Sequence, residues 1–461
     1  MVDDNLKNLQ GHARRKFLRW TTAMGAVLAL DRAKVLNVIN DSAGSAMADD
    51  ASCAATNRSV HLVAGDGGFA WFQLLWPHIA IAKAGNDGFA FHSNGNIMDA
   101  TDTDKPFVYA PESPWQKLDK RRRITAFMAG TNQTHTPTPG SAATLGNGVS
   151  MLAAAAAIQR QTPSLLPVIA ITPLNFGAAP GAPQIATVNN AEGMVQLFDS
   201  AASKETLTVA GDASLFEAYY KAFVGLNAAA GRPTWARPLR TGKTSANFLG
   251  KNLAAQLAPT ADDLARYNLG QGTPNRLGQI GRAFITTAKA FKLGLTQSVM
   301  MPAMRDDPHG AFNDMNNLRN TVAQLGKMFD EFMNDLIAIP DPVCSARSLA
   351  DSIVMTVHGD TPKNPRDRGG WPDGTPNNSN WLYVMGNGHL KTGWFGGVRA
   401  DGTTDGFDPA TGDTVPGQQS NATSAPAGAA VAFAVAKGDM RRVQDFYSGP
   451  SIAGIVNMNA V

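Results

Sequence analysis

Aspartate and histidine residues recur in four short polar segments, each of which directly follows an apolar run. The segments are residues 66–68, 131–135, 305–310 and 358–361. Carboxylates and neutral imidazoles are ligands of hydrolytic metal sites, where the metal polarises an ester oxygen or lowers the pKa of a bound water molecule. The side chains that could hold such a divalent metal are Asp66, Asp306, Asp307, His309, His358 and Asp360.

Each of these residues also has a purely structural explanation. Asp306 and Asp307 precede a predicted helix, and acids are favoured near helix N-termini. Asp66 stands beside two glycines and could be a turn residue. His358 and Asp360 could equally satisfy the polar groups of a loop. The sequence leaves both explanations open.

Other catalytic motifs are absent from the sequence. The seven histidines after residue 48 (His61, His78, His92, His135, His309, His358 and His389) have no Gly-x-Ser-x-Gly motif that would make one of them a triad base. No phosphate loop occurs, because Arg237 stands where such a loop before Gly242 needs glycine. Residues 65–68 are not a full dinucleotide fingerprint, and His135 is most simply a loop histidine.

Short apolar segments that alternate with longer helical patterns must position the polar residues. Strands are predicted at 59–65, 123–129, 167–172, 298–304, 352–357 and 381–385, and helices at 151–161 and 312–337, with a mostly helical region at 193–293. In the helix at 312–337, seven apolar residues from Met315 to Leu336 alternate at spacings of three and four, which places them on one stripe. A long surface loop is expected at 399–428, before the apolar segment 429–436.

The alternation predicts an α/β fold, with a mostly parallel sheet and helices on both faces, in a single domain over residues 57–461. In open α/β sheets, ligands bind beyond the carboxyl ends of the strands. The polar residues that follow the strands would therefore converge on one cleft.

The N-terminal 48 residues are predicted to be an export signal. Arg14 and Arg15 lead into an apolar run at 21–30, and an Ala-x-Ala site follows at 46–48. This layout is typical of a cleavable secretory signal, and the paired arginines resemble a twin-arginine motif. The alternative is a basic amphipathic helix on a membrane surface. Export predicts a periplasmic or secreted protein.

Charge and hydropathy exclude two classes of partner. Residues 1–48 hold seven basic and four acidic residues, so the rest of the chain has 33 of each and a formal charge of zero. A neutral body lacks the basic surface of a nucleic-acid binder. No stretch approaches the roughly 20 apolar residues of a membrane-spanning helix.

Two cysteines, Cys53 and Cys344, allow a single intramolecular disulfide. An oxidising compartment would permit that bond. The alternative is two unpaired thiols, which the loose Ala/Ser/Asp surroundings of Cys53 favour.

At the strand ends the chain resembles a family of twin-arginine-exported proteins in the alkaline phosphatase/sulfatase superfamily, in short patches over about 59–400. Residues 61–68 are similar to the family's first strand and Gly-Gly turn, and 381–397 to its glycine-rich strand and turn. Residues 304–310 are similar to its Trp-Asp-Thr-His segment, which implies that His309 takes the histidine and Asp307 or Asp306 the acid. Residues 352–364 resemble its Glu-Phe-Gly-Arg-Thr-Pro segment. The resemblance implies an alkaline-phosphatase-like core with irregular insertions.

The chain departs from the family at functional positions. Val357 stands where the family has Glu, and Asp360 where it has Arg. The Asp-His-Gly segment that supplies a second half of the metal site is not recognisable, since Asp373-Gly374 is followed by Thr375. No nucleophilic Ser or Thr can be carried over.

Two functions remain from this reasoning. The first is an exported, metal-dependent hydrolase that acts on a small-molecule or polymeric phosphate or sulfate ester. The second is a non-catalytic exported binding or structural protein that keeps the fold and has lost the metal site. The convergence of acids and histidines favours the hydrolase, and the missing Asp-His-Gly favours the binding protein.

Changing Arg14 and Arg15 together to Lys tests the export signal. We expect the double variant to stay in the cytoplasm, because twin-arginine recognition requires the arginine pair. Fractionation of cells that express the parent or the variant measures this. Unchanged export of the variant would remove the basis for the predicted location.

Overall fold

The computed structural model describes most of the chain after the predicted signal. The described residues are 56–65, 98–100, 102–109, 124–131, 143–160, 164–199, 252–304, 314–344, 346–359, 378–399 and 403–458, with the single positions 54, 75, 76, 78, 79, 141 and 162. Residues 1–48, predicted to be the export signal, lie outside this part of the chain. No helix within the described ranges is long and apolar enough to cross a membrane.

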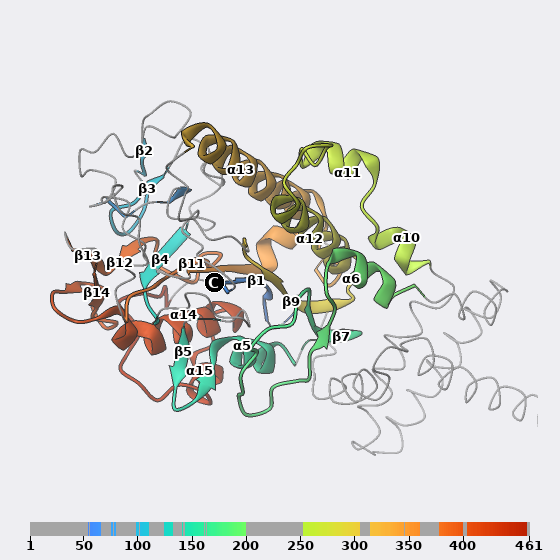
Figure 1. Cartoon of the computed structure of the whole chain (residues 1–461). Helices are drawn as coiled ribbons and strands as arrows, with labels where there is room; N and C mark the ends of the chain where they lie inside the picture. Colours follow the sequence, from blue (N-terminus) through green and yellow to red (C-terminus); the bar gives the residue numbers. More distant parts are fainter. Residues whose placement is uncertain are drawn as a thin grey trace, which may run out of the picture.

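An eight-stranded sheet forms the centre of the molecule (Figure 1), in the order β12-β4-β11-β10-β1-β9-β7-β8. Its strands are β1 (Arg58–Val63), β4 (Ile124–Met128), β7 (Leu166–Ala170), β8 (Ala186–Thr187), β9 (Thr296–Pro302), β10 (Ile353–His358), β11 (Trp381–Met385) and β12 (Gly393–Phe395). All neighbours are parallel except β11, which runs antiparallel to both β10 and β4. The prediction of a mostly parallel sheet is confirmed.

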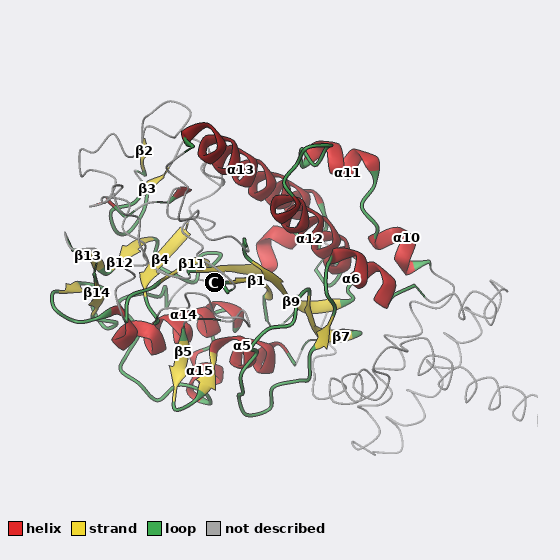
Figure 2. Cartoon of the chain, viewed as in Figure 1, coloured by secondary structure: helices red, strands yellow, loops and turns green. Residues whose placement is uncertain are grey.

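Helices cover both faces of this sheet (Figure 2). One face packs on α12 (Asn275–Lys292) and α13 (Met315–Ala338), and the other on α5 (Met151–Gln159) and α14 (Ser424–Val435). The side chains of β1 alternate between the two cores: Val60 and Leu62 face α12 and α13, whereas Val63 faces α5 and α14. His61 has the same parity as Val63 and therefore faces α5 and α14.

Shorter elements surround the main layers. The helices are α6 (Ala191–Leu197), α10 (Leu253–Leu257), α11 (Ala261–Arg266), α15 (Met440–Gln444) and the 3₁₀ turns η4 (Leu349–Ser352) and η5 (Ser420–Thr423). The strands are β2 (Met98–Asp99), β3 (Val108–Tyr109), β5 (Thr144–Gly146), β6 (Val149–Ser150), β13 (Gly397–Val398), β14 (Thr404–Phe407) and β15 (Thr414–Val415).

The predicted helix at 312–337 is α13, and its start bears on the candidate acids. Its N-cap is Asp314, whose carboxylate accepts hydrogen bonds from the backbone N–H groups of Asn316 and Asn317. From Leu318 to Leu336 the apolar stripe is buried as the spacing predicts, and Phe332 stacks on Phe284 of α12 at 4.5 Å. Because Asp314 fills the cap position, Asp306 and Asp307 are not the cap of this helix.

The prediction of a long surface loop at 399–428 is wrong in part. Strand β14 and turn η5 lie within it, and α14 begins there at Ser424. Phe407 is buried against Phe127 and Phe395, and the Thr423 hydroxyl donates to the carbonyl of Met128. The sequence does not predict these contacts, because the segment is rich in Gly, Thr and Pro and β14 contributes a single large apolar side chain to the core.

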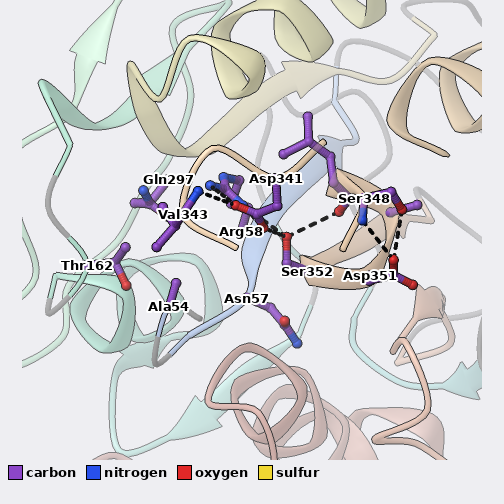
Figure 3. A network of polar contacts seen from close by, with 12 residues as sticks. Ala54, Asn57, Arg58, Thr162, Gln297, Asp341, Val343, Ser348, Asp351 and Ser352 are labelled. Atoms are coloured by element: carbon purple, nitrogen blue, oxygen red, sulfur yellow. Dashed lines mark hydrogen bonds and ion pairs between the residues drawn. The ribbon is translucent and has the colours of Figure 1, made fainter. Parts of the chain in front are cut away.

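A buried ion pair lies at the amino ends of the parallel strands (Figure 3). Arg58, the first residue of β1, donates from Nη1 and Nη2 to both carboxylate oxygens of Asp341, at 2.7 and 3.1 Å, and from Nη1 to the Ser352 hydroxyl at 2.9 Å. The side chains of Arg58 and Asp341 are 1% and 2% exposed. Burial alone would raise the pKa of the Asp341 carboxyl, but the hydrogen bonds and charge of Arg58, with Ser352 and the Val343 N–H, hold it below its usual value. The pair therefore stabilises the fold above the unfolded pKa of about 4, and this contribution is lost as the pH falls through the lower folded value.

Cys344 lies close in sequence to this pair and is disulfide-bonded. Cys53 is the chain's other cysteine and lies outside the described residues. The expectation of unpaired thiols is therefore wrong for Cys344.

Changing Arg58 to Met tests the importance of the buried pair. We expect the free energy of unfolding to fall by about 3–5 kcal/mol, because Asp341 would keep a buried charge without its counterion. The matched control is Arg441→Met, since Arg441 forms an ion pair with Asp439 while its side chain is 88% exposed; this change should leave the free energy of unfolding close to that of the parent, because exposed ion pairs contribute little. Equal urea-unfolding midpoints for the two variants would contradict the assignment.

Candidate functional site

The carboxyl ends of β1, β4, β9 and β10 lie at one edge of the sheet, because these strands run in the same direction. His358 is the one predicted metal ligand that the described residues include, and it is the last residue of β10. The other five predicted ligands, Asp66, Asp306, Asp307, His309 and Asp360, lie outside the described residues, as does His135. The structure therefore neither joins nor separates the predicted ligand set.

The position of His358 differs from the prediction in one respect. It was expected in a loop after the strand, but it continues the β10 ladder opposite Leu382 of β11 and is 1% exposed. The strand extends this far because β11 pairs with it from Met355 through His358. His358 therefore stands at the edge of the sheet as a buried side chain and not as part of an open loop.

A hydrogen-bonded chain of three side chains links the two central strands. The Thr356 Oγ1 atom lies 2.7 Å from His61 Nδ1 and 2.7 Å from His358 Nε2. The register places His61 of β1 opposite Thr356 of β10, and Thr356 and His358 share a face because they are two residues apart. The two imidazole rings lie edge to face, with centroids 6.2 Å apart.

In the described part of the chain, each histidine has a second ring nitrogen that is buried without a hydrogen-bond partner. These atoms are Nε2 of His61 and Nδ1 of His358. Leaving a buried polar atom unpaired costs about 1–3 kcal/mol, and such atoms are uncommon in folded proteins. Two of these atoms lie on side chains that share one hydroxyl partner, which makes the pair the candidate site in the described part of the chain.

Both imidazoles are neutral at physiological pH. Burial lowers the pKa of His61 to about 3, and burial, together with the charge of His61, lowers the pKa of His358 well below its usual value. A neutral imidazole keeps a lone pair on one nitrogen, which is the form that binds metal or accepts a proton. Shifted pKa values of this kind cluster at functional sites.

The backbone next to His358 is tightly packed. The N–H of Gly359 donates to the carbonyl of Trp381, and a Cβ atom at Gly359 would lie 2.5 Å from Asn380 Oδ1. Asn380 is itself fixed, since its Oδ1 accepts from the N–H of Trp381 and its Nδ2 donates to the carbonyl of Thr131 at 2.7 Å. Glycine is therefore required directly after His358, and the chain holds the histidine in place.

The polar character of this face continues toward the amino end of β1. The hydroxyl of Ser59 donates to Ser298 of β9, and Gln159 of α5 donates to Ser59 and to the carbonyl of Asn57. These side chains are buried and most of their polar atoms have hydrogen-bond partners, so a structural role explains their presence. Asn57 Oδ1 also lacks a partner among the described residues, and the two unpaired imidazole nitrogens lie nearer the carboxyl edge.

Sequence reasoning missed His61 and Thr356. His61 and Thr356 fall inside the predicted strands at 59–65 and 352–357, and the sequence assigns no metal-binding or catalytic role to either. The signal that could have found them is the alternation itself: a histidine inside an apolar strand, and the Thr-x-His spacing in another, put three polar groups on inward-facing positions. Among the residues that the structure describes, no group of three or more His, Cys, Asp or Glu is close enough to hold a metal ion.

Comparison with known proteins adds no relative. No protein-family model, curated protein or solved structure matches the chain. The fold beyond a mixed α/β core with a mostly parallel sheet, and any function of the chain, must therefore be argued from its own residues.

Proposed function

We propose that the chain is an exported, metal-dependent hydrolase of phosphate or sulfate esters, with its site at the carboxyl edge of β1, β9 and β10. The observation that carries this proposal is the buried, unpartnered Nδ1 atom of His358 at that edge. The alkaline-phosphatase-like core that the sequence motifs imply is part of the same proposal.

His358 fits the requirements of a metal ligand. Metal-binding histidines are neutral and use their other ring nitrogen in a hydrogen bond that fixes the ring. Nε2 of His358 has such a bond to Thr356, and Nδ1 is left free. Asp66, Asp306, Asp307, His309 and Asp360 would complete the ligand set, and Asp306 and Asp307 are freed from the alternative role of capping α13.

The chain's own residues would position the metal and exclude bulk water. When bound, a divalent metal would polarise an ester oxygen or lower the pKa of a water molecule. The packing of Gly359 against Asn380 and Trp381 would hold His358 in a fixed orientation. The carboxylates would balance the charge of the metal next to an anionic ester.

The disulfide at Cys344 supports export. Such bonds persist in oxidising compartments and are uncommon in the cytosol. Together with the paired arginines at 14 and 15, it favours a periplasmic or secreted location. We include this location in the proposal.

A non-catalytic binding protein is the second candidate. The burial of His61 and His358, at 0% and 1% exposure, favours it, because an active hydrolase must admit its substrate to the metal. The absence of a recognisable Asp-His-Gly segment points the same way. In this case the two histidines would be remnants of a lost site.

Metal content after histidine substitution separates the two candidates. We expect the purified, folded parent to hold about one or two equivalents of a transition metal after metal-replete expression, and His309→Ala and His358→Ala each to lose it. His389→Ala is the matched control, because this half-buried histidine follows β11 at the opposite edge of the sheet and should leave the metal in place.

The thermal stability of the metal-free proteins completes the experiment. The ligand role predicts that apo His309→Ala melts close to the apo parent, since the metal's own contribution has been removed from both. Hydrolysis of a chromogenic phosphate and a chromogenic sulfate ester is then compared between the metal-loaded parent and His358→Ala. A parent that binds no metal would favour the binding protein, and metal-loaded His309→Ala and His358→Ala variants would end the hydrolase proposal.

A further inference from the structure

The hydroxyl of Thr356 has two hydrogen-bond partners, and both are histidine nitrogens. Among the described residues no third group contacts Oγ1 at hydrogen-bond distance. A hydroxyl carries one proton, so it donates one hydrogen bond and accepts the other. The protonation of the two rings is therefore not independent.

Counting protons leaves two arrangements for a pair of neutral rings. In the first, His358 donates from Nε2–H to Thr356, and Thr356 donates to Nδ1 of His61; both rings then carry their proton on Nε2. In the second, Thr356 donates to Nε2 of His358 and accepts from Nδ1–H of His61; both rings then carry it on Nδ1. If both rings donated to Thr356, the buried hydroxyl proton would have no acceptor, at a cost of about 1–3 kcal/mol.

The two ring nitrogens that do not contact Thr356 are Nε2 of His61 and Nδ1 of His358. In either arrangement, one of them has a free lone pair and the other carries a proton. In the first, the lone pair is on Nδ1 of His358 and the N–H on Nε2 of His61. In the second, these roles are exchanged. The two histidines can thus form one metal bond between them, although both are neutral and both have an unpartnered nitrogen.

We propose that Thr356 locks the pair in the first arrangement, so that His358 is the single metal ligand and His61, which accepts the Thr356 hydrogen bond at Nδ1, positions it through Thr356. The direction of the lock rests on the proposed function, which needs the lone pair on His358 at the edge of the sheet. His61 is then excluded as a second ligand. Thr356 and His61 are positioning residues for His358.

Nitrogen NMR of the metal-free protein, labelled with ¹⁵N at histidine, tests the lock without using activity. Long-range ¹H–¹⁵N correlations report which ring nitrogen carries the proton. We expect His61 and His358 to be protonated on Nε2 in the parent and in Thr356→Ser, which keeps the hydroxyl. In Thr356→Val, which keeps the branched shape, we expect a measurable fraction of His358 to move its proton to Nδ1, because Nε2–H has lost its acceptor.

A second measurement, Zn²⁺ affinity, uses the same three proteins. Removal of a group that orients a ligand typically weakens metal binding about 10–100-fold. We expect this loss in Thr356→Val and near-parental affinity in Thr356→Ser. If the parent binds no Zn²⁺, the proposed function fails, while the NMR result still decides the lock.

Three NMR results would overturn the inference. They are protons on Nδ1 of both rings in the parent, protons on different nitrogens in the two rings, and a His358 ring in Thr356→Val that is unchanged from the parent. A Thr356→Val protein that binds Zn²⁺ as tightly as the parent would overturn the positioning role of Thr356.

Discussion

The buried ion pair between Arg58 and Asp341 sets the register on which the rest of the sheet's centre depends. Arg58 begins β1 opposite Ile353, and its guanidinium reaches the hydroxyl of Ser352, the residue just before β10. Ser352 also donates to the carboxylate of Asp341. Two buried charges are tolerated only with such close and matched contacts, because their desolvation costs several kcal/mol per ion. A slip of one residue between β1 and β10 would break these contacts.

The same register creates the histidine site. With Arg58 opposite Ile353, His61 falls opposite Thr356, three residues further along both strands. A shift by one residue would turn every β1 side chain to the other face and separate His61 from the Thr356 hydroxyl. The Arg58–Asp341 ion pair thus fixes the register of β1 against β10, and the contact between His61 and Thr356 follows from that register. Arg58 binds both carboxylate oxygens of Asp341 and leaves only its Nε unpaired, whereas each histidine leaves one of its two ring nitrogens unpaired.

The sequence predicts the framework better than the site. The strand at 381–385 and the long helix now seen as α13 follow from apolar runs and spacing, because burial of one face imposes a period that a sequence displays directly. The structure within 399–428 was missed, since β14 contributes little apolar area of its own. His358 was found by its type but placed in a loop, and His61 was overlooked. The contact of both histidines with Thr356 depends on the register between β1 and β10, which are almost 300 residues apart in the chain. The hydrophobic pattern of a single sequence does not predict the register between two such distant strands. The contributions of Asp66, Asp306, Asp307, His309 and Asp360 remain predictions.

A crystal of the protein grown with Co²⁺ and measured at the cobalt absorption edge tests the central claim most directly. The claim is that Nδ1 of His358 binds a metal at the carboxyl edge of the sheet. It predicts an anomalous-difference peak about 2.0–2.2 Å from that atom, with at least one of the predicted carboxylates at a similar distance and His61 outside the coordination sphere. A peak bound only by other residues, or a fully ordered His358 with no peak near Nδ1, would contradict the account.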